Sequence, residues 1–181
     1  MRETQFHREW IASWRYFFPS CHIIKIADTP YNPDTRFVPR KPYDLYAMLD
    51  GKFYAMELKL RTKLDSLQFE AITQGQIWNL KEAKENGALA YVVINYRESG
   101  MSEKKQKSRG LKSDRYFAVF VYDVDQFIWL DKNTTNKSVP FKAMRDHADF
   151  ILLEAGKDEK QGILWNIPKL VRKDSPIAEA V

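Results

Sequence analysis

Two carboxylates and a lysine lie on either side of one tight turn in this sequence. Asp44 precedes the turn dipeptide Asp50-Gly51, and Glu57 and Lys59 follow it. Carboxylates held close together repel each other unless a cation offsets their charge. Mg²⁺ takes oxygen ligands and is usually held by one or two carboxylates, together with water and substrate phosphate oxygens. A lysine beside the ion could stabilise charge that develops on a phosphate, or favour deprotonation of an attacking water, so this residue set is typical of phosphodiester hydrolysis.

The turn predicts how these side chains are arranged. Residues 43–49 and 52–58 are strand-like runs, and an Asp-Gly dipeptide between such runs favours a two-residue type I′ hairpin. In the register that this turn imposes, Asp44 faces Glu57, with Cβ atoms about 5 Å apart on one face of the hairpin. Lys59 shares this face, about 7 Å further along the strand.

A polar residue in the next helix supports the same site. We expect a helix at 65–85, with an N-cap at Asp65 or Ser66 and an end at Asn86-Gly87. Gln76 falls in the apolar stripe of this helix, between Ile72 and Leu80. The pattern therefore predicts that an amide points towards the core side.

Two interpretations of the hairpin remain open. In the first, Asp44 and Glu57 bind a metal, and a backbone oxygen such as the Leu58 carbonyl adds a further ligand. In the second, both carboxylates are solvated and Lys59 pairs with one of them. The defined register, the shared face and the position of Gln76 favour the first interpretation.

The other apolar patterns predict an α/β fold, a single domain with a central mixed β-sheet flanked by helices. The hairpin is expected near the middle of this sheet. The expected elements are a helix at 4–18, strands at 22–26, 88–95 and 116–122, and a short helix or strand at 125–130. The helix at 4–18 has an apolar stripe formed by Phe6, Trp10, Trp14 and Phe17. Residues 96–115 carry seven basic residues against three acidic ones, which predicts a mobile basic loop.

Composition narrows the class of protein. Hydrophobic residues make up 44% and charged residues 29% of the 181 residues, which is the balance of an ordinary folded protein. Cys21 is the only cysteine, so an internal disulfide and a cysteine-based zinc site are excluded. No apolar run approaches the roughly 20 residues that span a bilayer, and no secretory signal is recognisable. A net charge of +5 and a pI near 9.2 fit an anionic partner such as nucleic acid.

Basic residues flank the proposed site on both sides. Five of them are expected to contact DNA phosphates, namely Arg36, Arg40, Lys41, Arg61 and Lys63. The basic cluster 104–115 could also track a DNA backbone, and its alternative is a solvated loop.

The residues above, in their order along the chain, resemble a known family. The resemblance rests on Pro42-Tyr43-Asp44, Glu57-Leu58-Lys59, Gln76-Ile77 and the strand end Val93-Ile94-Asn95-Tyr96-Arg97. This set is similar to the restriction-endonuclease-like superfamily with the PD-(D/E)xK signature. Its order and spacing most resemble the RecU-type Holliday junction resolvases and their phage-encoded relatives.

The resemblance implies a metal-dependent endodeoxyribonuclease. Asp44 and Glu57 would bind Mg²⁺ or Mn²⁺, Lys59 would act on the nucleophile or the transition state, and Gln76 would position water or phosphate. Cleavage would leave a 5′-phosphate and a 3′-hydroxyl. The partners would be four-way DNA junctions and a second copy of the chain. The protein would act in DNA recombination and repair in the cytoplasm, and its origin could be cellular or viral.

The sequence departs from the family pattern in the first helix, and alternative functions remain open. Relatives usually carry a glutamate after the aromatic residue of the first helix, whereas here Phe6 is followed by His7, with Glu3 and Glu9 nearby. His7 and Glu9 are therefore further site candidates. The resemblance covers roughly residues 3 to 130, so we expect a nuclease core at 1–135 and a C-terminal extension of the same domain at 136–181, with no assigned role. The alternatives are another PD-(D/E)xK deoxyribonuclease, of restriction or repair type, and a non-catalytic basic DNA-binding dimer.

Overall fold

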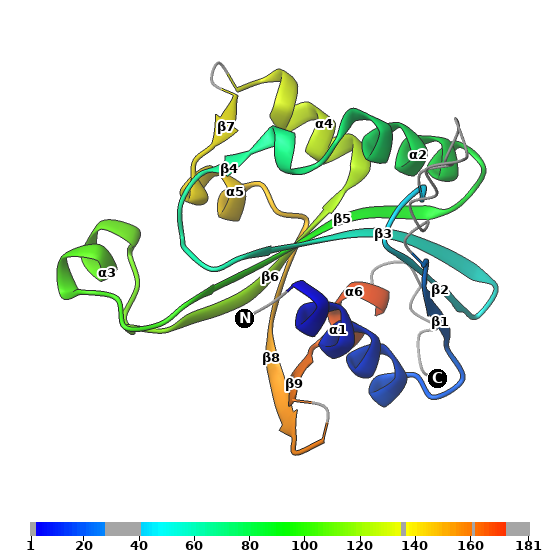
Figure 1. The fold of residues 1–181 in the computed structure, drawn as a ribbon, viewed down its shortest axis with the longest axis horizontal. Helices are drawn as coiled ribbons and strands as arrows, with labels where there is room; N and C mark the ends of the chain where they lie inside the picture. Colours follow the sequence, from blue (N-terminus) through cyan, green and yellow to red (C-terminus); the bar gives the residue numbers. More distant parts are fainter. Residues whose placement is uncertain (1–2, 28–40, 135–136, 161, 173–181) are drawn as a thin grey trace, which may run out of the picture.

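A seven-stranded mixed sheet forms the centre of the computed structural model, which describes residues 3–27, 41–134, 137–160 and 162–172. The strand order is β1-β2-β3-β5-β6-β8-β9, and the pair β3–β5 is parallel while the other pairs are antiparallel. The strands are β1 (His22–Lys25), β2 (Leu45–Leu49), β3 (Lys52–Arg61), β5 (Leu89–Glu98), β6 (Tyr116–Asp123), β8 (Phe150–Asp158) and β9 (Gly162–Trp165). Figure 1 shows this arrangement.

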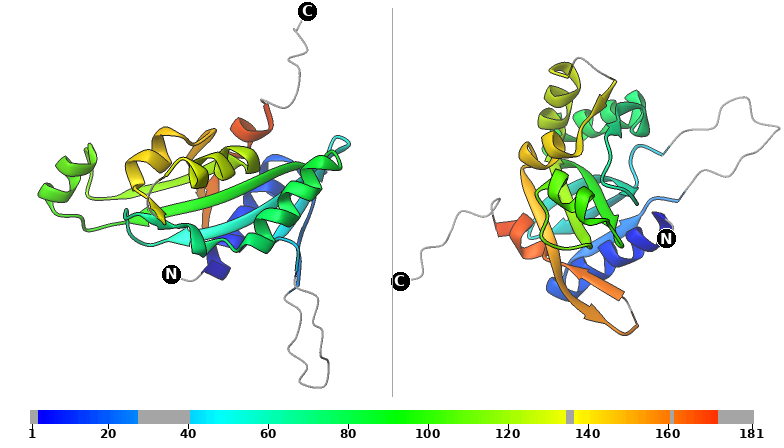
Figure 2. Two further views of the ribbon diagram at one scale, coloured as in Figure 1. Left: turned by 90° about the horizontal axis from the view of Figure 1, so that it is seen from above. Right: turned by 90° about the vertical axis from the view of Figure 1, so that its left-hand side faces the viewer.

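Helices cover both faces of the sheet, as the right-hand view of Figure 2 shows. One apolar cluster lies under α1 (Glu3–Phe17) and α6 (Ile167–Val171). The second lies under α2 (Gln74–Glu85), α4 (Val124–Lys132) and α5 (Phe141–Asp146). The described residues form a single domain, which confirms the predicted fold class.

The α1 stripe is confirmed by its packing. Phe6, Trp10 and Trp14 are fully buried, and the ring of Trp14 meets Tyr54 of β3 edge-on at 5.1 Å between centroids. These aromatic contacts attach α1 to the strand that carries the proposed site.

The hairpin register is confirmed over the length of β2. Leu49 pairs with Lys52, and the pairing continues to Leu45 and Met56. Asp50 and Gly51 have φ angles of 49° and 75°, as the two central positions of a type I′ turn require. The same register places Asp44, just before β2, across from Glu57.

The helix predicted at 65–85 begins later than expected. Residues 67–68 form β4 (Leu67–Gln68), which pairs with β7 (Ser138–Val139), and Phe69–Ala71 forms a 3₁₀ turn. Asp65 does not cap a helix, because β4 follows it and no helix begins there. Its carboxylate binds Arg61 at 2.5 Å. The N-cap is Thr73.

The prediction of a mobile loop at 96–115 is also wrong in part. Strand β5 continues to Glu98, and α3 (Glu103–Arg109) follows. Ser102 caps the start of α3, and Gly110 ends it in the left-handed conformation. Figure 1 shows α3 beyond the far end of β5 and β6. The undecided segment at 125–130 is helical and belongs to α4.

The segment from 137 onwards contributes to the same sheet. Strand β8 pairs with β6, and β9 pairs with β8. Helix α6 packs on the same face of the sheet as α1. None of the helices in the described ranges is long and apolar enough to cross a membrane.

Candidate active site

Asp44 and Glu57 are both buried at one place in the fold. Glu57 is 0% exposed in the middle of β3, and Asp44 is 3% exposed. The Asp44 carboxylate accepts a hydrogen bond from the Leu58 N–H at 2.9 Å, and its own carbonyl accepts one from the Ile26 N–H at 2.9 Å. Neighbouring strands on both sides therefore position Asp44, and the alternative in which both carboxylates are solvated is excluded.

Lys59 and Gln76 both bind the same oxygen of Glu57. The Lys59 ammonium lies 2.9 Å from Glu57 Oε1, and the Gln76 side-chain amide donates to this oxygen at 2.5 Å. The other oxygen, Glu57 Oε2, is buried and has no hydrogen-bond partner among the described residues. A buried carboxylate oxygen without a partner is costly, so this oxygen marks where a ligand would be stabilised.

The orientation of Gln76 follows from the cap of α2. Gln76 Oε1 accepts a hydrogen bond from the Thr73 N–H at 2.9 Å, and Thr73 Oγ1 accepts one from the Gln76 N–H at 3.3 Å. This reciprocal capping box leaves the amide nitrogen of Gln76 to face Glu57. The residue is half-buried in the first turn of α2, not deep in a longer helix as the sequence predicted.

Burial and the neighbouring carboxylate change the charge state of Glu57. Desolvation and repulsion from Asp44 raise the pKa of Glu57 from 4.5 to about 7, against the opposing effect of Lys59. Near neutral pH the Glu57 carboxylate is therefore close to its midpoint of protonation when no cation is bound. A cation between the two carboxylates would remove this repulsion.

Asp44 and Lys59 are shifted towards their charged forms. Burial alone would raise the pKa of Asp44, but hydrogen bonds from Lys41 and Leu58 and the nearby His7 lower it below its ordinary value. Burial alone would lower the pKa of Lys59, but attraction to Glu57 raises it. Lys59 therefore stays protonated at neutral pH and cannot act as a base there.

The first helix brings His7 to the carboxylates. His7 is 6% exposed, and its Nε2 lies 3.7 Å from Asp44 Oδ2. Neither ring nitrogen has a hydrogen-bond partner among the described residues. Burial lowers the pKa of His7, so the imidazole is neutral at pH 7 and keeps one nitrogen lone pair available to a cation.

Glu9 points to a different place from His7. Its carboxylate forms a buried ion pair with Arg97 of β5 and accepts a hydrogen bond from Gln5 at 3.1 Å. Glu3, which the sequence reasoning did not select, lies instead 4.0 Å from the Lys59 ammonium. The missed signal was the four-residue spacing of Glu3 and His7, which puts both on one side of a helix.

The donor set fits a hard or borderline divalent cation. Asp44, Glu57 and the backbone at Leu58 lie together, and both His7 and Glu57 have unpartnered polar atoms there. Within the described ranges, no group of three or more His, Cys, Asp or Glu side chains is arranged to hold a metal. An ion at the carboxylate pair would therefore take its remaining ligands from backbone, water or phosphate, as Mg²⁺ usually does.

The residues that were predicted to contact DNA lie in different environments. Arg36 and Arg40 lie outside the described residues. Lys41 is part of the site, because its ammonium lies 2.7 Å from Asp44 Oδ1. Arg61 binds Asp65, and Lys63 is exposed. In the basic cluster 104–115, Lys105 pairs with Glu98.

Comparison with known proteins finds similarity among solved structures only. No protein-family model matches the chain, and no curated protein matches it. A similar solved structure is that of Hjc, a Holliday junction resolvase from the archaeal hyperthermophile Archaeoglobus fulgidus, with a TM-score of 0.39 and 17% sequence identity. The match covers 75% of this chain and 84% of that chain. A likeness at this TM-score does not decide function, which has to follow from the residues of the site.

Proposed function

We propose that this protein is a Mg²⁺- or Mn²⁺-dependent endodeoxyribonuclease that hydrolyses phosphodiester bonds in branched DNA. The observation that carries the proposal is the state of Glu57. Its carboxylate is fully buried beside Asp44, with Lys59 and Gln76 on one oxygen and no described partner on the other. A purely structural carboxylate would be expected to have both oxygens paired.

Each side chain has a distinct task in this proposal. Asp44 and Glu57, with a backbone oxygen at Leu58, would hold the metal, which when bound supplies positive charge to the phosphate and makes a coordinated water more acidic. Lys59 stays protonated, so it stabilises the negative charge that develops on the phosphate in the transition state. Gln76 holds Glu57 in place and orients water or phosphate. Cleavage would leave a 5′-phosphate and a 3′-hydroxyl.

The choice of branched DNA rests on the order of motifs along the chain. Asp44, the Glu57-Leu58-Lys59 triplet and Gln76 follow one another as in the RecU-type resolvases, and the net charge of +5 suits a polyanionic substrate. Symmetric cutting of a four-way junction needs two sites. The working form would therefore be a homodimer.

A cleavage assay on three substrates tests the proposal. The protein is incubated with a four-way junction, a linear duplex and single-stranded DNA, each with Mg²⁺ or with EDTA. Symmetric nicking of the junction alone, and only with metal, is the expected result. Cutting of linear duplex at fixed sequences would indicate a restriction-type target, and binding without any product would indicate a DNA-binding module.

Two variants test whether cleavage depends on the proposed site. Glu57→Ala should abolish cleavage and leave junction binding unchanged in EDTA, because the metal is lost and the DNA contacts remain. Glu82→Ala removes an exposed carboxylate of α2 and serves as the matched control. Cleavage retained in Glu57→Ala would contradict the proposed site.

A further inference from the structure

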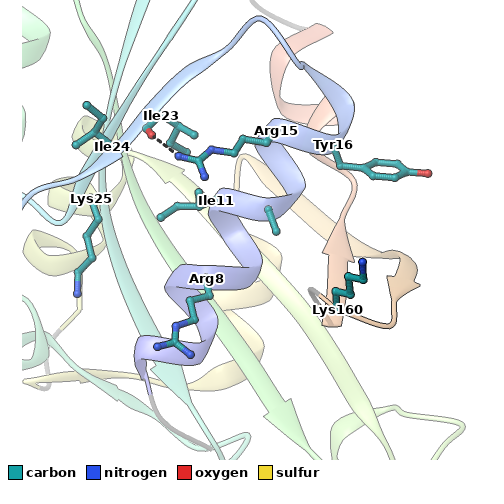
Figure 3. Close-up of a pocket in the computed structure, with 9 residues that line it drawn as sticks. Arg8, Ile11, Arg15, Tyr16, Ile23, Ile24, Lys25 and Lys160 are labelled. Carbon is teal, nitrogen blue, oxygen red and sulfur yellow. Dashed lines mark hydrogen bonds between the residues drawn. The ribbon is translucent and has the colours of Figure 1, made fainter.

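A basic hollow lies between α1 and β1, the edge strand of the sheet. Its volume is about 700 Å³, and its walls come from α1, β1 and the turn after β8. The residues that matter here are four cations, Arg8, Arg15, Lys25 and Lys160, and two exposed apolar side chains, Tyr16 and Ile24. We call this surface the α1–β1 groove, and no acidic residue among those that the structure describes lines it. Figure 3 shows how these side chains are arranged around the helix.

The two arginines lie on one side of α1. Arg8 and Arg15 are seven residues apart, or about two helical turns, which separates them by about 10.5 Å along the axis. They are exposed, while Trp10 and Trp14 on the opposite side of the helix are fully buried. A span of about 10.5 Å equals about three base steps of B-form DNA, at 3.4 Å per step along the axis.

The cations of the groove have no acidic partner in the part of the chain that the structure describes. Within the described ranges, no carboxylate forms an ion pair with Arg8, Arg15, Lys25 or Lys160. Arg15 only donates to the Ile23 carbonyl, at 3.4 Å. Uncompensated charges of one sign on one surface attract a polyanion.

One end of the groove lies beside the carboxylate site. Arg8 directly follows His7 along α1. Lys25 pairs across the β1–β2 ladder with Leu45, the residue after Asp44. An extended ligand in the groove would therefore run towards Asp44.

We infer that the α1–β1 groove binds the sugar–phosphate backbone of the DNA that enters the active site. The inference rests on the proposed function and adds a binding surface to it. The spaced cations match successive phosphates. Tyr16, which also lines the groove, is 60% exposed, and its ring gives a sugar or an unpaired base an apolar surface to pack on.

Salt-dependent binding of a four-way junction in EDTA tests the groove without any cleavage. The variant R8Q/R15Q/K25Q is compared with K132Q/K137Q/K142Q, which loses the same charge from exposed lysines of the α4–α5 region. Removing three phosphate contacts should lower the slope of log K against log salt by about 2.7, whereas the control should keep the wild-type slope. Between 50 and 200 mM salt, the wild type should then lose about 40-fold more affinity than the groove variant.

Labelling of a single thiol gives a second measurement that needs no charge change. Ala12 lines the groove and Cys21 is buried, so Ala12→Cys introduces a thiol that maleimide can reach. DNA should slow its labelling in proportion to the bound fraction. The same DNA should leave Lys142→Cys unaffected.

Several results would overturn the inference. These are a slope that is unchanged in the groove variant, an equal decrease of the slope in K132Q/K137Q/K142Q, no protection of Ala12→Cys by DNA, or no DNA binding by the wild type. Equal competition by polyglutamate at the same charge would indicate an acidic protein in place of nucleic acid. Because binding is measured without metal, failure of the groove leaves the Glu57→Ala cleavage result intact, and the two proposals can fail separately.

Discussion

The buried carboxylate of Glu57 should make the metal-free protein lose stability as the pH rises towards neutral. Burial and Asp44 raise the pKa of Glu57 from 4.5 to about 7 in the folded state. Because the folded pKa is the higher one, folding takes up a proton between these values. The stability from this group is therefore fully present below pH 4.5 and is lost as the pH rises through 7.

The magnitude follows from the two pKa values. Between pH 5 and pH 8 a group shifted from 4.5 to about 7 changes the free energy of unfolding by about 2–3 kcal/mol. Asp44 does not contribute in this window, because its pKa is lowered from 3.8 and its ionisation is complete below pH 5.

Urea unfolding in EDTA at both pH values measures the effect. Wild type should lose about 2–3 kcal/mol more than Glu57→Gln on going from pH 5 to pH 8, since the other titrating groups cancel in the comparison. Glu82→Gln, in which the lost carboxylate is exposed, should behave as wild type. If Glu57→Gln and wild type had parallel pH profiles, Glu57 would ionise with its ordinary pKa and the electrostatic account of the site would be refuted.

Three further substitutions test neighbouring parts of the fold. Lys59→Met should slow single-turnover cleavage by about 10²–10³-fold with unchanged junction binding in EDTA, and weaker binding would make it a DNA contact instead. His7→Leu should weaken Zn²⁺ binding more than Mg²⁺ binding in titration calorimetry, because imidazole suits Zn²⁺ whereas Mg²⁺ prefers oxygen ligands, and an equal effect on both ions would exclude direct ligation. Glu9→Leu should cost about 3–5 kcal/mol in urea unfolding by removing the carboxylate that neutralises the buried Arg97, and adding Arg97→Met should restore much of this stability. No recovery would argue against the ion pair.

Local sequence signals predicted the hairpin and most elements of the fold. The Asp50-Gly51 turn and the alternation of the flanking strands defined the register that β2 and β3 adopt. The aromatic stripe of α1 predicted its buried side. These features depend on backbone preferences and periodicity within about ten residues, so the sequence is sufficient for them.

The start of α2 and the segment before β6 were not predictable in the same way. Residues 67–68 pair with β7, which lies about 70 residues later in the chain, and this pairing overrides the local helical pattern. Helix α3 occupies a segment whose charges favoured a loop. In both places tertiary contacts or caps decided between local alternatives.

The sequence by itself determined which side chains could do chemistry, and only the tertiary structure decided their surroundings. It placed Asp44 opposite Glu57 and Lys59 on the same face, because strand geometry is local. It could not determine that Glu57 is fully buried with one oxygen unpartnered, or that α1 turns His7 towards Asp44 and Glu9 towards Arg97. Desolvation and side-chain direction depend on how α1, α2 and β5 pack around β3, and this packing is set by contacts between residues far apart in the chain.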